Sequence, residues 1–217
     1  MIHSFVLANG LRAYIAPTEH VPMVSIHIVY PFNPLMVSDG IPHLAEHLMF
    51  EETVNIPNGD VDRWLRMAGG HSTAWTTWDA IHIESSVSSN NLDVLLYIEQ
   101  ERATNLCVAL TDESLENQRT IIAQEMWNRS FQKDAELADQ LRKRMFHTHP
   151  ILSKEVIGLI YDIEMADKDS ICTFLNTWIH PSNAIWLVSG DVDVVDFENR
   201  LTESFSVGVT DRLFPDV

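Results

Sequence analysis

The chain has 217 residues, which is long enough to bury a hydrophobic core without disulfide bonds. Its hydrophobic fraction of 46% and charged fraction of 21% are typical of folded proteins and exclude a disordered or low-complexity chain. The 31 Asp and Glu residues outnumber the 14 Lys and Arg residues, and the formal net charge of -17 would repel nucleic-acid phosphates. We therefore expect a globular protein that does not bind nucleic acid.

The cysteines and the N-terminal segment bear on the cellular compartment. Cys107 and Cys172 form neither a CxxC motif nor a disulfide framework, and each lies in an apolar helical pattern, so we expect two buried free thiols. The N-terminal segment MIHSFVLANGLRAYIA has no basic stretch followed by a long apolar one, and no apolar run of about 18 residues occurs in the chain. These features predict a cytoplasmic protein with no membrane span.

The first part of the chain mixes strand and helix patterns. Asn9-Gly10 lies between two short apolar runs, which predicts a type I′ hairpin turn and an opening β-meander. His43, His47 and Phe50 recur at helical spacing and predict a short helix after the breaker Gly40. The predicted strands are 4–7, 12–16, 24–30, 71–75 and 80–87, and the predicted helices are 41–50, 61–67 and 92–104.

Helical patterns dominate the rest of the chain. Thr111, followed by Asp112 and Glu113, is a typical N-cap with an acidic first turn, and it predicts a long helix that runs to about Lys143. The other predicted elements are helices at 153–161, 166–178 and 194–204 and a strand at 184–188. With no internal repeat and no Gly/Ser linker, we expect one α+β domain over residues 1–217, an antiparallel β-sheet with helices packed mainly on one face.

The segment His43-Leu44-Ala45-Glu46-His47 carries the strongest chemical signal. On a helix, residues i and i+4 lie one above the other, so His43 and His47 can point at a single metal ion. Glu46 lies near the same face, where it can hold a metal-bound water and take its proton. Histidines on a helix are more often ordinary core or surface residues, but this combination favours a zinc site with a general base.

Catalytic zinc normally takes three protein ligands, so one more residue is needed. Glu125, on the long predicted helix, is the best candidate, although spacing alone does not select it among the many acids of the chain. We expect His71 to be a polar residue at a sheet edge, and His147 and His149 to belong to a turn that ends a helix rather than to a metal site.

At this point the sequence resembles the pitrilysin/insulysin family of zinc metallopeptidases, which includes the mitochondrial processing peptidases and the bacterial two-domain zinc proteases. The order H-x-x-E-H is the inverzincin signature. The resemblance extends over residues 9–12, 40–50, 69–76, 119–125 and 181–184. It implies a pitrilysin-like peptidase domain with Zn2+ as cofactor, His43, His47 and Glu125 as metal ligands, and Glu46 as the catalytic base.

Several residues depart from the family's pattern. Gln118 stands where the family generally carries a second Glu, behind the metal ligands, and Thr73 replaces the usual Asn of the glycine-strand motif. Glu51-Glu52-Thr53 replaces the usual Lys-Gly-Thr and adds negative charge beside the site. If these acids line the cleft, basic peptides should be preferred, and salt should weaken the preference.

The resemblance also implies how substrate and partner would bind. A peptide substrate would add as an extended strand to the sheet edge formed by Ser72, Thr73, Ala74, Trp75 and Thr76. Trp75, Trp78 and Trp127 would either bind an apolar substrate side chain or pack in the core or an interface. Family members pair two homologous domains, and the second contributes an Arg–Tyr pair that grips substrate, so a chain that stops near Val217 is expected to form a homodimer or a heterodimer with a homologous subunit.

Two functional hypotheses follow from these residues. The leading one is a zinc-dependent endopeptidase that cleaves peptides or small proteins. The alternative is a non-catalytic metal-binding subunit that forms one wall of a partner peptidase chamber. A redox or nucleotide enzyme is set aside, because the chain has no CxxC, GxGxxG or P-loop motif.

Overall fold

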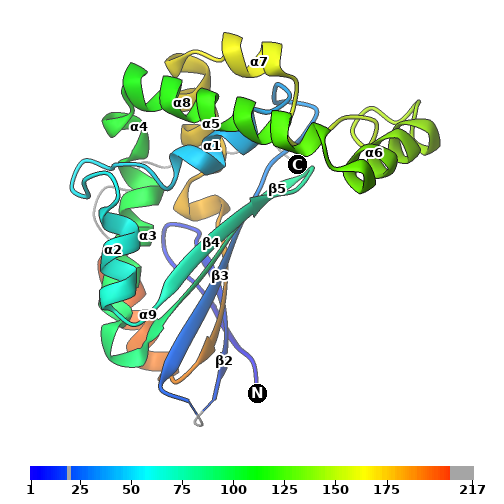
Figure 1. Cartoon of the computed structure of the whole chain (residues 1–217). Coiled ribbons are helices and arrows are strands. Elements are labelled where there is room, and N and C mark those ends of the chain that lie inside the picture. The colour runs from blue at the N-terminus through cyan, green and yellow to red at the C-terminus, as the bar shows by residue number, and fades with distance from the viewer. Residues whose placement is uncertain (19–20, 206–217) are drawn as a thin grey trace.

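The computed structural model describes residues 1–18 and 21–205, so residues 206–217 of the expected domain lie outside the described residues. Its centre is one six-stranded sheet in the order β1 (His3–Val6), β2 (Arg12–Pro17), β6 (Ile185–Gly190), β3 (Met23–Pro31), β5 (Ala80–Ser88) and β4 (His71–Thr76). Helices α2 (Asp60–Met67), α3 (Leu92–Thr104) and α9 (Val194–Phe205) lie along one side of this sheet (Figure 1). Helices α1 (Ile41–Leu48), α5 (Asp112–Ser130), α7 (Ile160–Met165) and α8 (Lys168–Trp178) gather beyond one end of it. The predicted α+β class is therefore confirmed.

The sheet is mostly antiparallel, and its connectivity differs from the predicted meander. The strands are β1 (His3–Val6), β2 (Arg12–Pro17), β3 (Met23–Pro31), β4 (His71–Thr76), β5 (Ala80–Ser88) and β6 (Ile185–Gly190). β1 and β2 form the expected hairpin, but β6 lies between β2 and β3 and pairs in parallel with β2. The meander prediction is wrong because a strand from the far end of the chain fills the position beside β2.

The turn between β1 and β2 is not of type I′. That turn needs positive φ at both central residues. Gly10 has a φ of 87°, whereas no non-glycine residue within 1–18 and 21–205 has a positive φ, Asn9 included. The Asn9 side chain instead accepts a hydrogen bond from the backbone N–H of Leu11 at 3.1 Å, which closes the loop locally.

The predicted helices are found with three differences, one of which is an additional short helix at Leu106–Ala109. The helices are α1 (Ile41–Leu48), α2 (Asp60–Met67), α3 (Leu92–Thr104), α4 (Leu106–Ala109), α5 (Asp112–Ser130), α6 (Lys133–Met145), α7 (Ile160–Met165), α8 (Lys168–Trp178) and α9 (Val194–Phe205), with short 3-10 turns at Ser89–Asn91 and Pro181–Asn183. The long helix after Thr111 ends at Ser130, because Gln132 is extended and starts α6. Thr111 is the predicted N-cap, and its side chain accepts from the backbone N–H of Ser114.

The helix predicted at 153–161 is largely absent. Only α7 is helical there, and it begins at Ile160. Gly158 has a φ of 80°, and a Cβ at this position would lie 2.5 Å from the Cα of Gly40. The chain therefore makes a tight turn against the start of α1, which a continuous helix could not do.

The core holds α1 in a fixed orientation. Alternate residues of β3 are buried, as expected for a strand with one face against helices. Leu44, Ala45 and Leu48 of α1 are also buried in this core, each at 1% exposure or less. Because these residues occupy one side of α1, its histidines face away from the core and toward α5.

Cys107 and Cys172 form a disulfide that joins α4 to α8, so the prediction of two free thiols is wrong. Their Cα atoms are 5.4 Å apart, within the usual range for a disulfide, and 65 residues separate them in sequence. Disulfides persist mainly in oxidising compartments, so the cysteines no longer support a cytoplasmic location. No helix in the described part of the chain has the length and apolar character needed to cross a membrane.

Reducing this disulfide should lower stability. Closing a loop between cysteines 65 residues apart reduces the entropy of the unfolded chain and should contribute about 4 kcal/mol to the free energy of unfolding. Urea unfolding with and without a reductant measures this contribution. A Cys107→Ser/Cys172→Ser variant is the control, since reductant should not shift its midpoint. A wild-type midpoint that does not respond to reductant would contradict the assignment.

Candidate metal centre

The site begins with α1, whose start is set by local backbone geometry. Gly40 has a φ of 79°, and Pro42 occupies the first turn, where a missing N–H costs nothing. His43 and His47 then lie one turn apart on the side of the helix that faces α5, both partly buried, with ring centroids 4.7 Å apart. The two imidazole side chains therefore point toward the same place, as the motif predicted.

The third member of the cluster comes from α5. Glu125 Oε2 lies 3.7 Å from His43 Nε2 and 3.6 Å from His47 Nε2. Two atoms that each bind a tetrahedral zinc at about 2.1 Å lie about 3.4 Å apart, so these separations fit a shared ion. In the part of the chain that the structure describes, these residues are the only group of three His, Cys, Asp or Glu side chains able to hold a metal.

The electrostatic setting suits neutral imidazole ligands. Burial lowers the pKa of His43 from 6.5 to about 4, and the nearby His47 and Arg129 contribute to the same shift. His43 is therefore uncharged at neutral pH and has a lone pair to offer a cation. Its Nδ1 is buried and makes no hydrogen bond to the described residues. The two nitrogen atoms and the carboxylate oxygen form the donor set of a typical catalytic zinc site.

Gln118 lies behind this cluster, on the side of His47 away from Glu125. It sits on α5 about two turns before Glu125, and it is only 5% exposed. Its Oε1 is 3.0 Å from His47 Nδ1, a normal hydrogen-bond distance. Gln118 thus contacts Nδ1 of the His47 ring, whereas Nε2 of the same ring faces Glu125.

Glu46 lies beside the cluster and faces β4. The hydroxyl of Thr76 donates a hydrogen bond of 2.5 Å to Glu46 Oε2. Burial raises the pKa of Glu46 above its usual value, and the Thr76 hydrogen bond works in the opposite direction. A partly buried carboxylate held by one hydroxyl is well suited to accept a proton. Thr76, which the family resemblance implied as a substrate-binding residue, therefore also contacts the candidate base.

The predicted substrate strand is an edge strand with one side unpaired. Within the described residues β4 pairs with β5 alone, so its other edge offers backbone groups for another strand. Ala74, Trp75 and Thr76 line a cleft of about 590 Å3 that also contains the metal cluster. Ser72 instead accepts a hydrogen bond from Ser85, and Thr73 is not among the described cleft-lining residues.

The charges of the cleft differ from the sequence expectation. Neither Glu51 nor Glu52 is among the described residues that line it. The acids that line it besides the metal cluster and Glu46 are Asp139 and Glu155, and both form ion pairs with Lys143, at 2.7 Å and 2.8 Å. The condition on which a preference for basic peptides was predicted is therefore not met.

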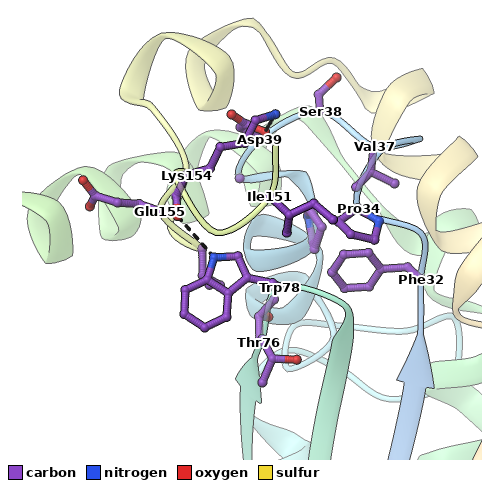
Figure 2. A pocket seen from close by; sticks show the side chains of 14 residues that line it. Phe32, Pro34, Val37, Ser38, Asp39, Thr76, Trp78, Ile151, Lys154 and Glu155 are labelled. Atoms are coloured by element: carbon purple, nitrogen blue, oxygen red, sulfur yellow. Dashed lines mark hydrogen bonds and ion pairs between the residues drawn. The ribbon is translucent and has the colours of Figure 1, made fainter. Parts of the chain in front are cut away.

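A second, smaller pocket lies next to the cleft and shares Thr76 and Trp78 with it. Its volume is about 40 Å3, enough for a few water molecules but not for a large side chain. Figure 2 shows the Trp78 indole beneath the loop that carries Lys154, with its Nε1 donating to the Lys154 carbonyl oxygen at 3.2 Å. Lys154 also pairs with Asp39 at 2.8 Å. These contacts fix the loop beside the site.

The other candidate residues lie elsewhere. His71 Nδ1 is 3.1 Å from the hydroxyl of Ser86, and His149 Nδ1 accepts from the backbone N–H of Leu152, as expected for polar residues of an edge strand and a turn. Trp75 and Trp78 line the cleft. Trp127 is not among its described lining residues; it is 62% exposed and packs against Phe131.

Sequence reasoning missed Arg129, which lines the cleft and lowers the pKa of His43. Its spacing contained the signal, because residues i and i+4 share a helix face and Glu125 precedes it by four positions. Asp139 and Arg142 of α6 also line the cleft. They could not be placed from the sequence, because the predicted single helix would have carried them away from the site.

Comparison with known proteins gives a family and a set of relatives. Residues 37–156 match the family described as Insulinase (Peptidase family M16). The chain is 31% identical over 198 residues to the zinc protease PqqE of Helicobacter pylori, covering 88% of this chain and 43% of that protein. It is 26% identical over 200 residues to the probable zinc protease PqqL of Escherichia coli, covering 86% of this chain and 21% of that protein. The chain thus spans less than half the length of these curated relatives.

Solved structures agree with the sequence relatives. The crystal structure of a protease from Helicobacter pylori is similar with a TM-score of 0.88 and 25% identity, covering 100% of this chain and 53% of that one. The ferredoxin protease FusC, solved as a mutant in complex with Arabidopsis ferredoxin, is similar in fold, with a TM-score of 0.81 and 22% identity over 99% of this chain and 25% of that one. This chain therefore has the fold of a part of these larger proteins.

The ligand assignment predicts which variants lose metal. His43→Ala, His47→Ala and Glu125→Ala should each reduce the bound zinc well below about one ion per chain, because two remaining ligands do not complete the coordination sphere. Zinc analysis by mass spectrometry after dialysis measures this, with Glu116→Ala, a surface carboxylate of the same helix, as the matched control. Full zinc content in Glu125→Ala would show that the third ligand lies elsewhere.

Proposed function

We infer a peptidase function because this chain belongs to the insulinase family, peptidase family M16. Our proposal is that the chain, as one domain, is a zinc-dependent endopeptidase unit that hydrolyses peptides or small proteins. The observation that carries it is the convergence of His43, His47 and Glu125, whose ligand atoms lie within 4.8 Å of one another, beside the partly buried carboxylate of Glu46. A metal-binding cluster beside a carboxylate, in a large cleft next to an open sheet edge, has the features expected of a peptidase site.

The chain's own residues would perform the proton transfers. Zn2+ held by the three ligands would supply a Lewis acid that polarises the peptide carbonyl. Glu46 would accept a proton from the attacking water and deliver it to the leaving amine, so that the C–N bond breaks after the water oxygen adds to the carbonyl carbon. The Thr76 hydroxyl would hold the Glu46 carboxylate in place for both transfers.

The edge strand would position the substrate. A peptide added to the free edge of β4 would form backbone hydrogen bonds that do not depend on its side chains. Ala74, Trp75 and Thr76 both line the cleft and belong to this strand, so the added peptide would run past Glu46. Trp75 and Trp78 would then contact its side chains.

A non-catalytic role is the second candidate. The chain covers 43% of the Helicobacter pylori zinc protease, so the cleft observed here would be completed by further protein. Under this hypothesis the domain binds metal and forms one wall of a partner's chamber without cleaving peptide itself. The presence of Glu46 beside the cluster favours the catalytic hypothesis.

The catalytic hypothesis predicts that Glu46→Gln keeps its zinc and loses turnover. Removing a general base typically lowers the rate by about 100-fold or more, whereas the zinc ligands are untouched. Zinc content and cleavage of a fluorogenic peptide library, with chelation and zinc restoration as a check, separate the two effects. A Glu46→Gln protein as active as wild type would exclude this mechanism, and zinc binding without any cleavage would favour the non-catalytic subunit.

The peptidase proposal also predicts assembly. We propose that a second wall comes from an identical subunit, since twofold dimers are the commonest oligomers, or from a homologous subunit. Light scattering should therefore find a dimer, or activity should appear only when a homologous subunit is added. A monomer with full peptidase activity would show that no second wall is needed.

A further inference from the structure

Gln118 contacts a carboxylate on the side opposite His47. Its Nε2 donates a hydrogen bond to Glu51 Oε1, and its Oε1 is 3.0 Å from His47 Nδ1. The other oxygen of Glu51, Oε2, accepts from the side chain of Asn58. A continuous hydrogen-bonded chain therefore runs from Glu51 through the amide of Gln118 to the imidazole of His47.

The side-chain amide of Gln118 can form a hydrogen bond with His47 Nδ1 in either of two orientations. Its oxygen can accept from a protonated Nδ1, or its NH2 can donate to a bare Nδ1. The second orientation puts the imidazole proton on Nε2, the atom that faces Glu125, and leaves no lone pair there for a cation. Contact between Gln118 and His47 alone does not select the orientation that suits metal binding.

The carboxylate of Glu51 removes this ambiguity. An ionised carboxylate only accepts hydrogen bonds, so the NH2 of Gln118 must face Glu51 and its oxygen must face His47. The opposite orientation would place the amide oxygen against a carboxylate oxygen in a site where Gln118 is 5% exposed. Glu125 Oε2 would favour a proton on Nε2, but at 3.6 Å it is too far for a good hydrogen bond, whereas the 3.0 Å contact at Nδ1 is within range.

Glu51 is itself held in place by the local fold. It follows α1 closely in the chain, and its backbone N–H donates to the carbonyl oxygen of Leu48 at 3.2 Å. Two residues further on, Thr53 donates from its hydroxyl to the buried carboxylate of Glu101 at 2.8 Å. The carboxylate of Glu51 thus has a defined position relative to the helix that carries His47.

We propose that Glu51 is a positioning residue that acts through Gln118 to keep His47 in the Nδ1–H tautomer, with the Nε2 lone pair directed at the metal. This proposal rests on the ligand set of the proposed function. It concerns the metal-free protein as well, so it can be tested whether or not the protein is a peptidase.

The test compares variants of nearly equal side-chain size. Glu51→Gln removes the fixed acceptor, and Glu52→Gln is the matched control next to it. The double variant Glu51→Gln/Gln118→Glu exchanges the carboxylate and the amide, so the carboxylate accepts directly from His47 Nδ1–H and the net charge of the protein is unchanged. Melting temperatures establish that each variant is folded.

Two readouts are used. Long-range 1H–15N correlation spectra of metal-free protein at a pH of about 8, above the usual titration range of imidazole, report the tautomer of His47. Competition with a chromophoric chelator gives the zinc dissociation constant. We expect the Nδ1–H tautomer in wild type, in Glu52→Gln and in the double variant. Glu51→Gln alone should show a substantial fraction of the Nε2–H tautomer and roughly tenfold or more weaker zinc binding, the size usual for loss of a group behind a metal ligand.

The opposite result would overturn the proposal. If Glu51→Gln keeps the wild-type tautomer, or if the double variant fails to restore it, Glu51 does not set the orientation of His47. A wild-type protein that binds no zinc would remove the proposed function, yet the tautomer measurement on the same samples would still decide the role of Glu51.

Discussion

The buried ion pair between Arg102 and Glu99 of α3 fixes the end of the helix that carries the metal ligands. Both side chains are 0% exposed, and Arg102 Nη1 lies 2.6 Å from Glu99 Oε1. Arg102 Nε also donates to the carbonyl oxygen of Met49 at 3.0 Å, and its guanidinium stacks over the Phe50 ring at 4.3 Å. Burying a charge pair is costly, and here Glu99 Oε2 and Arg102 Nη2 are buried without a hydrogen-bond partner among the described residues. Loss of either residue of the pair would leave an uncompensated charge in the core. The position of α1, and with it the site, depends on this contact.

The same helix α3 also orders the loop that follows α1. The carboxylate of Glu101, 2% exposed, accepts from Thr53 at 2.8 Å and from Asn55 at 2.9 Å. One turn of α3 therefore holds both the end of α1 and the start of the next loop. Glu51 lies between these two anchors in the chain, and its carboxylate contacts Asn58 and Gln118. Helix α3 therefore contacts the chain on both sides of Glu51, at Met49 and at Thr53.

The parts of this structure that were predictable are those set by neighbours in sequence. His43 and His47 face the same space because they are four residues apart on a helix, and the Thr111 cap is equally local. The assignment of Glu125 as the third ligand depended on family resemblance, because its distance from α1 is set by how α1 and α5 pack. The position of β6 and the Cys107–Cys172 disulfide join distant segments, and no periodic pattern indicates such pairings. Glu51 and Gln118 looked like two unrelated departures from the family pattern until the fold placed them in contact.

The distribution of charge in the cleft limits how the proposed enzyme could choose substrates. The net charge of -17 belongs to the chain as a whole, whereas Asp139 and Glu155 in the cleft are paired with Lys143, and Arg129 adds a positive charge close to His43. An electrostatic preference for basic peptides needs unpaired acids along the path of the substrate. The edge of β4 would bind backbone atoms irrespective of sequence. Selection among peptides would therefore depend on Arg129 and on the aromatic side chains of Trp75 and Trp78, which line the same cleft.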